Sequence, residues 1–369
     1  MSMVEWKKLG EVCSFNRGRT ITAKDAVEGD VPVIAGGQTP SYYHNQANRM
    51  GECITVAGSG AYAGFISYWN QPIYVSDAFT VDPIKNVLYK YVFQWLKMNQ
   101  QRIYDTQKGA GVPHVHGRDI ANFIIPIPSL AEQNRIVGIL DTFTSSIENL
   151  KEQIAQRRKQ YEYYRDQLLD LEGKDGAKNI KLENIVSQDC SLSYGIVQPG
   201  DDVFEGVPVV RPVDLITTFV NRKGLKNTTK QISDSYKRTI LKGNEILFCV
   251  RGTTGVMSLA TQSLVGCNVT RGIVPISFDN EITKMFVYYQ LKSRKLQKVI
   301  ADKTNGTALK QINVKDLRQI NLIIPSLSEQ QRIVGILDVF ETSIQNLEAQ
   351  LTLREKQYEY YRYKLLTFE

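Results

Sequence analysis

The sequence holds one glycine-rich run whose spacing could bind a nucleotide cofactor. In ITVAGSGAYAG, glycines stand at positions 58, 60 and 64. A dinucleotide-binding loop has the spacing G-x-G-x-x-G and leads directly into a helix, whose N-terminus holds the phosphates. Here the third glycine comes one residue late, and the following FISYWNQPIYVSDAFTV is typical of strands. The run therefore predicts glycine-rich turns or a close backbone approach rather than a cofactor site.

The HVH segment could present two metal ligands, His114 and His116, from one face of a strand. The only other histidine is His44, and the matching positions in the second half of the chain are Gln311 and Asn313. A metal site is therefore not expected. A polar pair that contacts a ligand or a phosphate in both halves is the better functional interpretation, although an ordinary surface pair is the commoner case.

No other catalytic pattern stands out in the sequence. It contains no G-x-x-x-x-G-K-[ST] phosphate loop. No Ser/His/Asp or Cys/His set and no pair of carboxylates can be assembled from it. We therefore predict no catalytic residue and no metal ligand.

Length and composition indicate an ordinary globular protein of two or three domains. The chain has 369 residues, of which 42% are hydrophobic and 22% are charged. Its start, MSMVEWKKLG, lacks the apolar segment of a signal peptide, and no apolar run long enough to span a membrane follows. The five cysteines are an odd number without a Cys-x-x-Cys pair, which favours reduced thiols. We expect a cytoplasmic protein with no membrane partner.

A stretch of about 40 residues occurs twice. KQYEYYR stands at residues 159–165 and again at 356–362. Over residues 129–169, 27 of 41 positions are identical to the residues found 197 positions later. The two copies therefore predict the same structure twice.

Apolar residues in both copies alternate at spacings of four and three, which is typical of a coiled-coil seam. The seam skips one position in each copy, which holds Arg157 or Arg354. PSLAEQ and PSLSEQ each place a serine three residues before a glutamate, a capping-box start. We expect long helices over 129–172 and 328–369 that pair with each other in antiparallel orientation; pairing with a different protein is the alternative.

Some residues outside the seam are also identical in the two copies, and the seam does not require this. We interpret them as one partner-binding surface used twice. They are Lys159, Gln160, Glu162 and Arg165 in the first copy and Lys356, Gln357, Glu359 and Arg362 in the second.

The two remaining segments, 1–128 and 173–327, are weaker copies of each other. GDVPVI answers EGVPVV, and the second segment is 16 residues longer before its next matching strand. Short β-rich runs broken by Gly and Pro predict mixed α/β domains, with helices near 87–102 and 283–300. Residues 176–327 hold 21 basic and 12 acidic residues, and such an excess raises the odds of a polyanionic partner.

These features resemble the specificity subunit of a type I restriction–modification system. The resemblance covers essentially the whole chain. It is carried by the helix entries IPIPSLAEQNRIVGILD and IIPSLSEQQRIVGILD, the paired KLGEV and KLENI, SYGIVQPG, and KTNGTALKQINVKDL.

The resemblance implies an α+β fold. Two target-recognition domains, 1–128 and 173–327, would each read one half of a bipartite double-stranded DNA sequence. Helices 129–172 and 328–369 would form an antiparallel coiled coil with pseudo-twofold symmetry that sets the unread spacer.

The resemblance also implies that the chain is not an enzyme and binds no cofactor itself. Two modification subunits, which use S-adenosylmethionine to methylate adenine, would dock on the repeated helices. In complete systems, restriction subunits driven by ATP would join them.

Polar or aromatic residues in predicted loops are the candidate DNA contacts, because Arg often reads guanine and Asn often reads adenine. In the first domain they are Arg17, Arg19, Tyr42, Tyr43, His44, Ser59, Tyr62, Lys108 and His114. In the second they are Arg211, Arg222, Lys223, Arg251, Thr253, Asn268, Arg271, Lys303, Asn305 and Lys310. Two alternative functions stay open: a stand-alone sequence-specific DNA-binding protein, and a coiled-coil scaffold whose domains bind proteins.

Overall fold

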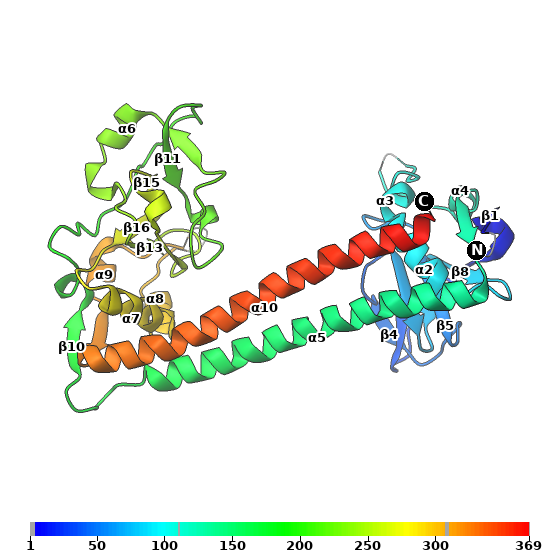
Figure 1. Cartoon of the computed structure of the whole chain (residues 1–369), viewed down its shortest axis with the longest axis horizontal. Coiled ribbons are helices and arrows are strands. Elements are labelled where there is room, and N and C mark those ends of the chain that lie inside the picture. Colours follow the sequence, from blue (N-terminus) through cyan, green and yellow to red (C-terminus); the bar gives the residue numbers. More distant parts are fainter. Residues whose placement is uncertain (1–3, 110, 307–309, 369) are drawn as a thin grey trace. The chain divides into compact units, whose positions relative to one another are not determined.

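The computed structural model describes residues 4–109, 111–306 and 310–368, which fall into two compact units (Figure 1). Unit 1 comprises residues 1–152 and 347–369, and unit 2 comprises residues 153–346. Each unit joins a β-rich head to parts of two long helices, α5 (Leu130–Leu168) and α10 (Leu327–Thr367). The four segments expected from the sequence are thus grouped by packing into two units.

Head 1 runs from β1 to β9. A four-stranded antiparallel sheet has the order β2-β8-β5-β6, a second sheet has the order β4-β3-β7, and β1 pairs with β9. Its strands are β1 (Glu5–Lys8), β2 (Cys13–Arg17), β3 (Val31–Ile34), β4 (Tyr42–His44), β5 (Glu52–Ala57), β6 (Ile66–Asn70), β7 (Tyr74–Val75), β8 (Ala78–Pro83) and β9 (Ile124–Ile127). Its helices are α1 (Leu9–Val12), α2 (Tyr89–Met98), α3 (Gln100–Tyr104) and α4 (Gly117–Ile120).

Head 2 runs from β10 to β17. Its sheets have the orders β12-β11-β15, β14-β13-β16 and β10-β17. The strands are β10 (Lys178–Lys181), β11 (Val207–Val210), β12 (Lys226–Thr228), β13 (Ile246–Cys249), β14 (Met257–Leu259), β15 (Asn268–Val269), β16 (Ile273–Ile276) and β17 (Asn321–Ile324). The α-helices are α6 (Lys230–Asp234), α7 (Glu281–Lys292), α8 (Arg294–Asp302) and α9 (Val314–Arg318); 3-10 turns are η1 (Leu182–Asn184), η2 (Pro212–Asp214), η3 (Lys237–Thr239) and η4 (Gln262–Leu264).

The two heads pair their strands in the same way. In head 1, β3 is antiparallel to β4 and parallel to β7; in head 2, β11 is antiparallel to β12 and parallel to β15. Likewise β5 lies antiparallel between β6 and β8, and β13 lies antiparallel between β14 and β16. The longer connection of head 2 accommodates η2, α6 and η3. Two diverged sequences therefore build one common framework.

Each predicted head helix is in fact two helices. The one expected over 87–102 breaks at Asn99 into α2 and α3, and the one expected over 283–300 breaks at Ser293 into α7 and α8. Ser293 has an extended backbone, with φ −63° and ψ 150°, and its hydroxyl accepts a hydrogen bond from the Leu296 amide. This is an N-cap, and it starts a new helix. The apolar pattern missed the break because both helices pack on one core.

The core of each head includes the adjoining part of a long helix. In unit 1, Ile136 and Leu140 of α5 are fully buried in the cluster that holds Leu96 of α2. In unit 2, Ile333 and Leu337 of α10 are buried in the same way with the cluster of α7. Each long helix is therefore anchored over its first turns by a head's hydrophobic core.

Two predicted long helices are confirmed, with 39 residues in α5 and 41 in α10. Half of each expected capping box forms, because the Ser129 hydroxyl accepts from the Glu132 amide at 3.4 Å, as Ser326 does from Glu329. The other half is replaced, since the Glu132 carboxylate takes two hydrogen bonds from Arg135 instead, at 2.8 and 2.6 Å.

The arginine gaps in the apolar pattern have a structural reason. In unit 1, Phe143 of α5 packs on Tyr358 and Tyr361 of α10, and the Arg354 guanidinium lies over the Phe143 ring at 5.6 Å. The Lys151–Glu355 contact shows that residue numbers on the two helices run in opposite directions in this unit. These contacts are typical of an antiparallel seam in which arginine covers an aromatic ring.

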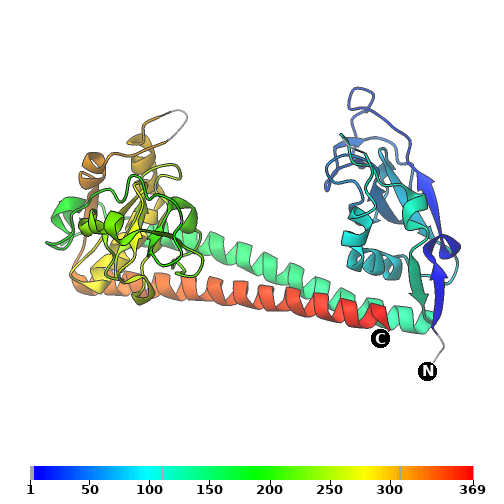
Figure 2. The ribbon, with the colours of Figure 1, turned by 90° about the horizontal axis from the view of Figure 1, so that it is seen from above.

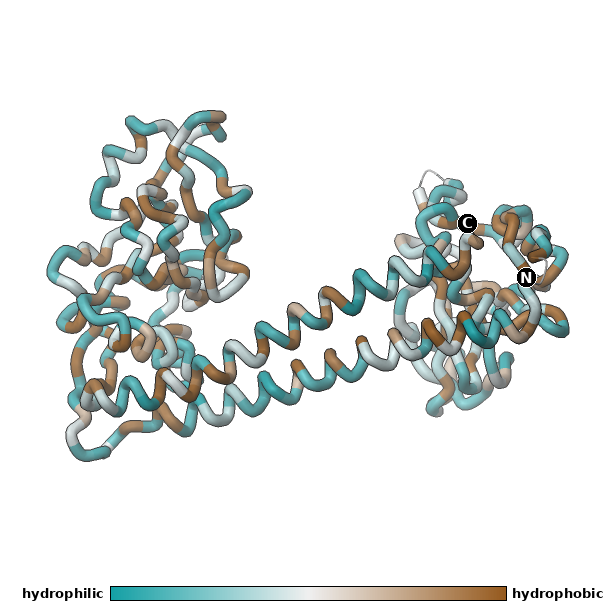
Figure 3. The backbone as a smooth tube through the Cα atoms, in the orientation of Figure 1, coloured by the Kyte–Doolittle hydropathy of each residue, from teal (hydrophilic) through white to brown (hydrophobic). Residues whose placement is uncertain are grey.

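Unit 2 repeats these contacts at positions shifted by 197 residues. Phe340 of α10 packs on Tyr161 and Tyr164 of α5, and the Arg157 guanidinium lies 5.9 Å from the Phe340 ring centre. Figure 2 shows α5 and α10 side by side within this unit, and Figure 3 shows hydrophobic segments recurring along both helices.

Among the described residues, none of the helices combines the length and apolar character needed to cross a bilayer. The described cysteines are free thiols. Burial, with a smaller effect of Asp82, raises the pKa of Cys13 and of Cys53 to about 12, so both thiols stay protonated and unreactive near neutral pH.

Candidate nucleic-acid interface

In head 1, residues 58–65 are joined by backbone hydrogen bonds to two neighbouring segments that come much later in the chain, 105–109 and 111–116. We call the set of residues 58–65, 105–109 and 111–116 loop cluster 1. Ser59 pairs with His114, and Lys108 and His114 exchange amide–carbonyl bonds of 2.9 and 2.8 Å. The Gly60 amide donates to the Pro113 carbonyl at 3.0 Å. These bonds fix the loops, so that their side chains are presented from a defined backbone.

Head 2 builds the same arrangement from different residues. Loop cluster 2 comprises residues 250–256, 303–306 and 310–313; residues 307–309, which fall in the quoted motif at 303–317, lie outside the described residues. Arg251 pairs with Gln311, and Asn305 and Gln311 exchange bonds of 2.8 and 2.9 Å. The Gly252 amide donates to the Lys310 carbonyl at 2.8 Å. The backbone platform is thus common to both heads, whereas the side chains on it differ.

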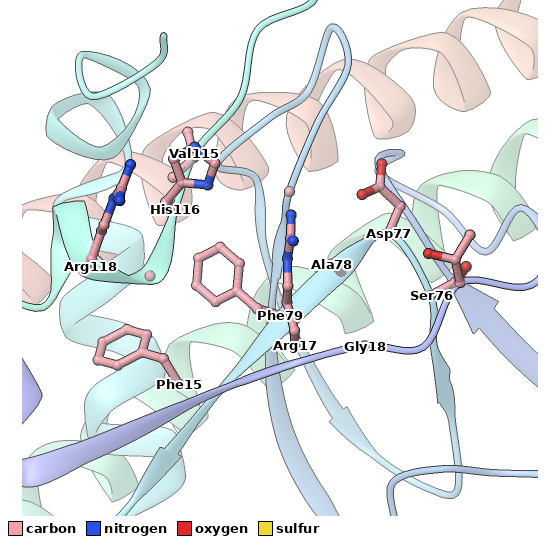
Figure 4. Close-up of a pocket in the computed structure, with 13 residues that line it drawn as sticks. Phe15, Arg17, Gly18, Ser76, Asp77, Ala78, Phe79, Val115, His116 and Arg118 are labelled. Atoms are coloured by element: carbon pink, nitrogen blue, oxygen red, sulfur yellow. The ribbon is translucent and has the colours of Figure 1, made fainter.

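A pocket of about 540 Å³ opens beside loop cluster 1. Figure 4 shows Arg17 between one side of the pocket, which carries His116 and Arg118, and the opposite side, which carries Asp77. The Ser59 hydroxyl donates to the Asp77 carboxylate, so loop cluster 1 and the pocket share a wall. Arg118 and His116 are missing from the candidate DNA contacts. His116 was considered only as half of the HVH polar pair, and the only sequence signal for Arg118 is a basic residue two positions after HVH.

The HVH histidines stack on each other. Their rings lie nearly parallel, with centres 6.4 Å apart and planes 7° apart. In the part of the chain that the structure describes, no three His, Cys, Asp or Glu side chains come together to hold a metal ion. The stacked pair joins loop cluster 1 to the pocket, because both histidines belong to the cluster and His116 also lines the pocket.

The sequence matches the family described as "Type I restriction modification DNA specificity domain" over residues 1–157 and 205–353. The chain belongs to this family. It is 28% identical to the specificity subunit of the type I restriction enzyme EcoR124I/EcoR124II from Escherichia coli, over 99% of this chain and 94% of that protein. It is 24% identical to the EcoBI specificity subunit of the same organism, over 90% of this chain and 74% of that protein.

Solved structures of specificity subunits share the fold. A crystal structure of the S subunit of a type I restriction–modification system from M. genitalium superposes with a TM-score of 0.65 at 16% identity, over 99% of this chain and 96% of that one. A subunit from a study of complex assembly and conformational transition of the type I R-M system gives 0.59 at 18% identity, over 98% and 97%. The family predicted from the sequence is confirmed.

Within this family's fold, nine of the candidate DNA contacts meet in the two loop clusters. Ser59, Tyr62, Lys108 and His114 lie in cluster 1; Arg251, Thr253, Asn305 and Lys310 lie in cluster 2, with Lys303 at its edge. Arg17 is the last residue of β2, Arg19 follows that strand, and Arg271 precedes β16. Lys108 also binds Asp119 at 2.7 Å, and this hydrogen bond holds the pKa of the Asp119 carboxyl below its usual value.

Two candidate contacts are wrong because their side chains are buried. Asn268 is 0% exposed and accepts a hydrogen bond from the Thr239 hydroxyl at 2.7 Å. His44 is 6% exposed, and its Nδ1 lies 3.0 Å from the Val27 amide. Both satisfy the interior of a head, since buried polar groups need partners, and neither can reach a base.

Other candidates are exposed or half-buried but already hold a neighbour. The Arg211 guanidinium binds Asp214 at 3.0 and 2.8 Å, the Arg222 guanidinium donates to the Ser263 carbonyl at 2.8 Å, and the Tyr42 hydroxyl donates to the Ile21 carbonyl at 2.5 Å. Tyr43 and Lys223 stay exposed without such a contact among the described residues.

Six of the eight residues expected to form a docking surface on the helices are accessible, and the two arginines need a correction. Lys159, Gln160, Glu162, Lys356 and Glu359 are exposed and Gln357 is half-buried.

The two arginines of this set are covered. The Arg165 guanidinium lies over the Tyr161 ring at 5.5 Å, and the Arg362 guanidinium lies over the Tyr358 ring at 5.2 Å. Both side chains therefore pack on their own helix and are not expected to bind a partner. Tyr163 and Tyr360, which we did not predict, are 61% and 59% exposed at equivalent positions.

Proposed function

We propose that the two heads bind double-stranded DNA through their loop clusters and that each reads one half of a bipartite sequence. One observation carries the proposal: the heads share a backbone platform but present different side chains on it. Where head 1 has Ser59, Lys108 and His114, head 2 has Arg251, Asn305 and Gln311. Base edges are read by side chains, so one platform with two sets of side chains suits two unlike half-sites.

Charge and exposure support the same proposal. Arg17, Arg251 and Arg271 have no hydrogen-bond or ion-pair partner for their guanidinium groups among the described residues. An arginine that is not neutralised within its own chain is available to phosphate oxygens or to guanine. A protein-binding scaffold would have no need of this arrangement, and the family description names DNA specificity.

We further propose that the chain supplies recognition and no catalysis. Two modification subunits would dock on α5 and α10, in complete systems restriction subunits would join, and S-adenosylmethionine and ATP would bind to those partners in the cytoplasm. The support is that relatives of this chain are named specificity subunits of type I restriction enzymes. The twice-used exposed residues around Tyr163 and Tyr360 suit two copies of one partner related by the pseudo-twofold repeat.

Replacing Arg251 with alanine tests base reading by head 2. We expect the mutant to bind its target about 1–3 kcal/mol more weakly and to tolerate other bases at one position of one half-site. Selection of binding sites from a random duplex pool measures both effects. Lys178→Ala is the matched control, because Lys178 is exposed on β10 beside Ile324 of β17, away from loop cluster 2. Unchanged preference at every position would show that Arg251 is structural.

Lengthening both long helices tests their role as a spacer. We expect one heptad inserted between residues 152 and 153, and another between 346 and 347, to lengthen the unread spacer by about three base pairs. Seven residues keep the seam in register and add about 10 Å of helix, and B-DNA advances about 34 Å per turn of about ten pairs. The spacer is measured by site selection, and an unchanged spacer contradicts the proposal. A heptad in one helix alone should destabilise the protein instead.

A further inference from the structure

More cationic than acidic side chains line the pocket beside loop cluster 1. Thirteen residues line it, among them the cations Arg17 and Arg118, the imidazole of His116 and one carboxylate, Asp77. Neither guanidinium has a hydrogen-bond or ion-pair partner among the described residues, whereas Asp77 already accepts the Ser59 hydroxyl. The pocket is therefore lined by two exposed arginines without an intramolecular partner among the described residues and by one carboxylate that already accepts a hydrogen bond.

Close backbone packing gives this pocket its shape. A Cβ on Gly18 would lie 2.4 Å from the carbonyl oxygens of Ser76 and Val75, and a Cβ on Gly117 would lie 2.9 Å from the Cβ of Phe15. A side chain at either position would clash, so glycine lets the end of β2 approach residues 75–76 and the start of α4 approach Phe15. The arginines next in sequence, Arg17 and Arg118, both line this pocket (Figure 4).

Head 2 fills the same position with its own side chain. The Arg19 amide donates to the Val75 carbonyl in head 1 as the Ile196 amide donates to Val269 in head 2, at 3.0 and 2.8 Å. This pairing aligns Arg17 with Tyr194. The Tyr194 hydroxyl accepts a hydrogen bond from the Val314 amide at 3.1 Å, at the first residue of α9.

Its side chain therefore connects the segment after η1 to α9. Where head 1 has the exposed guanidinium of Arg17, head 2 has a half-buried phenol that is already hydrogen-bonded within its own chain.

We infer that the Arg17–Arg118 pocket binds a single backbone phosphate of the DNA duplex, and that head 2, among its described residues, lacks the Arg17 half of this site. The inference rests on the proposed DNA binding and adds the location of one phosphate contact. Guanidinium groups form short, paired hydrogen bonds with phosphate oxygens, and two arginines in a walled space suit one such group. Because phosphate contacts fix register, this site sets how head 1 lies on its half-site.

A scan with neutral phosphates tests the site in the full chain. Target duplexes are made in which one phosphate at a time is a methylphosphonate, and each is bound by the natural protein and by the Arg17→Ala, Arg118→Ala double variant. For the natural protein we expect one position, in the half-site of head 1, where the substitution weakens binding about tenfold. The double variant should bind the unmodified duplex about tenfold more weakly. A methylphosphonate at that one position should not weaken its binding further.

Controls separate this result from misfolding and from other anions. Lys85→Ala removes an exposed charge seven residues beyond Ala78, past the far end of β8, and should leave the scan unchanged. Arg17→Lys with Arg118→Lys keeps the charge and should restore part of the coupling. Thermal unfolding with and without inorganic phosphate shows whether the pocket holds a free anion.

The possible outcomes decide between distinct failures. If the methylphosphonate and the arginine substitutions weaken binding independently at every position, the phosphate site is overturned, whereas the proposed DNA binding is not. Stabilisation by inorganic phosphate that depends on the arginines, again without coupling, makes the pocket a free-anion site and also overturns it. A natural protein that binds no duplex overturns the proposed function itself.

Discussion

Replacing Glu341 with alanine is expected to lower the free energy of unfolding of unit 2 by about 3 kcal/mol. The Glu341 carboxylate of α10 binds the Lys292 ammonium at 2.8 Å and accepts the Tyr161 hydroxyl at 3.0 Å and the Thr218 hydroxyl at 3.4 Å. The carboxylate is 13% exposed and Lys292 28%. Removing one partner of such a pair leaves a poorly solvated charge, which costs about 3–5 kcal/mol when burial is complete. Urea unfolding measures the change.

A matched surface substitution provides the control for Glu341. Glu162 of α5 lies in the same unit, is 53% exposed and reaches Arg294 only at 3.9 Å. Glu162→Ala should change stability by less than about 1 kcal/mol, as exposed ion pairs do. Glu341→Gln keeps hydrogen-bond acceptors and should fall between the two. If Glu341→Ala is no more destabilising than Glu162→Ala, the buried network does not hold head 2 on its helices.

Replacing Asn268 with alanine is expected to cost about 3 kcal/mol of stability and to leave DNA specificity unchanged. Its Oδ1 accepts from the Thr239 hydroxyl at 2.7 Å and the Val269 amide at 2.9 Å, and its Nδ2 donates to the Ser233 hydroxyl at 3.0 Å. Each buried group left without a partner costs about 1–3 kcal/mol. Urea unfolding and site selection below the unfolding temperature measure the two effects.

The same substitution at Asn305 is the matched control and should behave in the opposite way. Asn305 is exposed in loop cluster 2, and its backbone, not its side chain, joins the cluster. We expect Asn305→Ala to change DNA preference while stability stays within about 0.5 kcal/mol. If Asn268→Ala changes DNA specificity, or if it does not destabilise the protein, burial does not explain the role of Asn268.

Equivalent residues of the two nearly identical helices bind different partners in the two units. Asp141 of α5 binds Lys90 of head 1 at 2.6 Å, whereas its equivalent in α10, Asp338, accepts the Tyr289 hydroxyl of head 2 at 2.5 Å. In unit 1 the Tyr358 hydroxyl donates to Gln94 at 2.7 Å.

The equivalent tyrosine in unit 2 is Tyr161, and it donates to Glu341 instead. Burial and Glu341 raise the pKa of Tyr161 well above its usual value, so this hydroxyl keeps the proton that it donates. Retaining acceptors and donors on the helices while the heads diverge is a physical basis for one scaffold with unlike readers.

The sequence by itself was sufficient for the long helices, their seam, the serine caps and the family. These features depend on local periodicity and on short motifs, and both are written in neighbouring residues. Even the seam's arginine gaps were visible, although their reason, a guanidinium over Phe143 or Phe340, needed the partner helix.

Only the tertiary structure decided which loops meet and which polar side chains stay outside. Ser59 and His114, or Arg251 and Gln311, are more than 50 residues apart and touch only because the strands beneath them pair. Asn268 and Asn305 are the same residue type in the same head, yet one is sealed in the core and the other faces solvent. Burial and loop contact are long-range properties, and no local pattern encodes them.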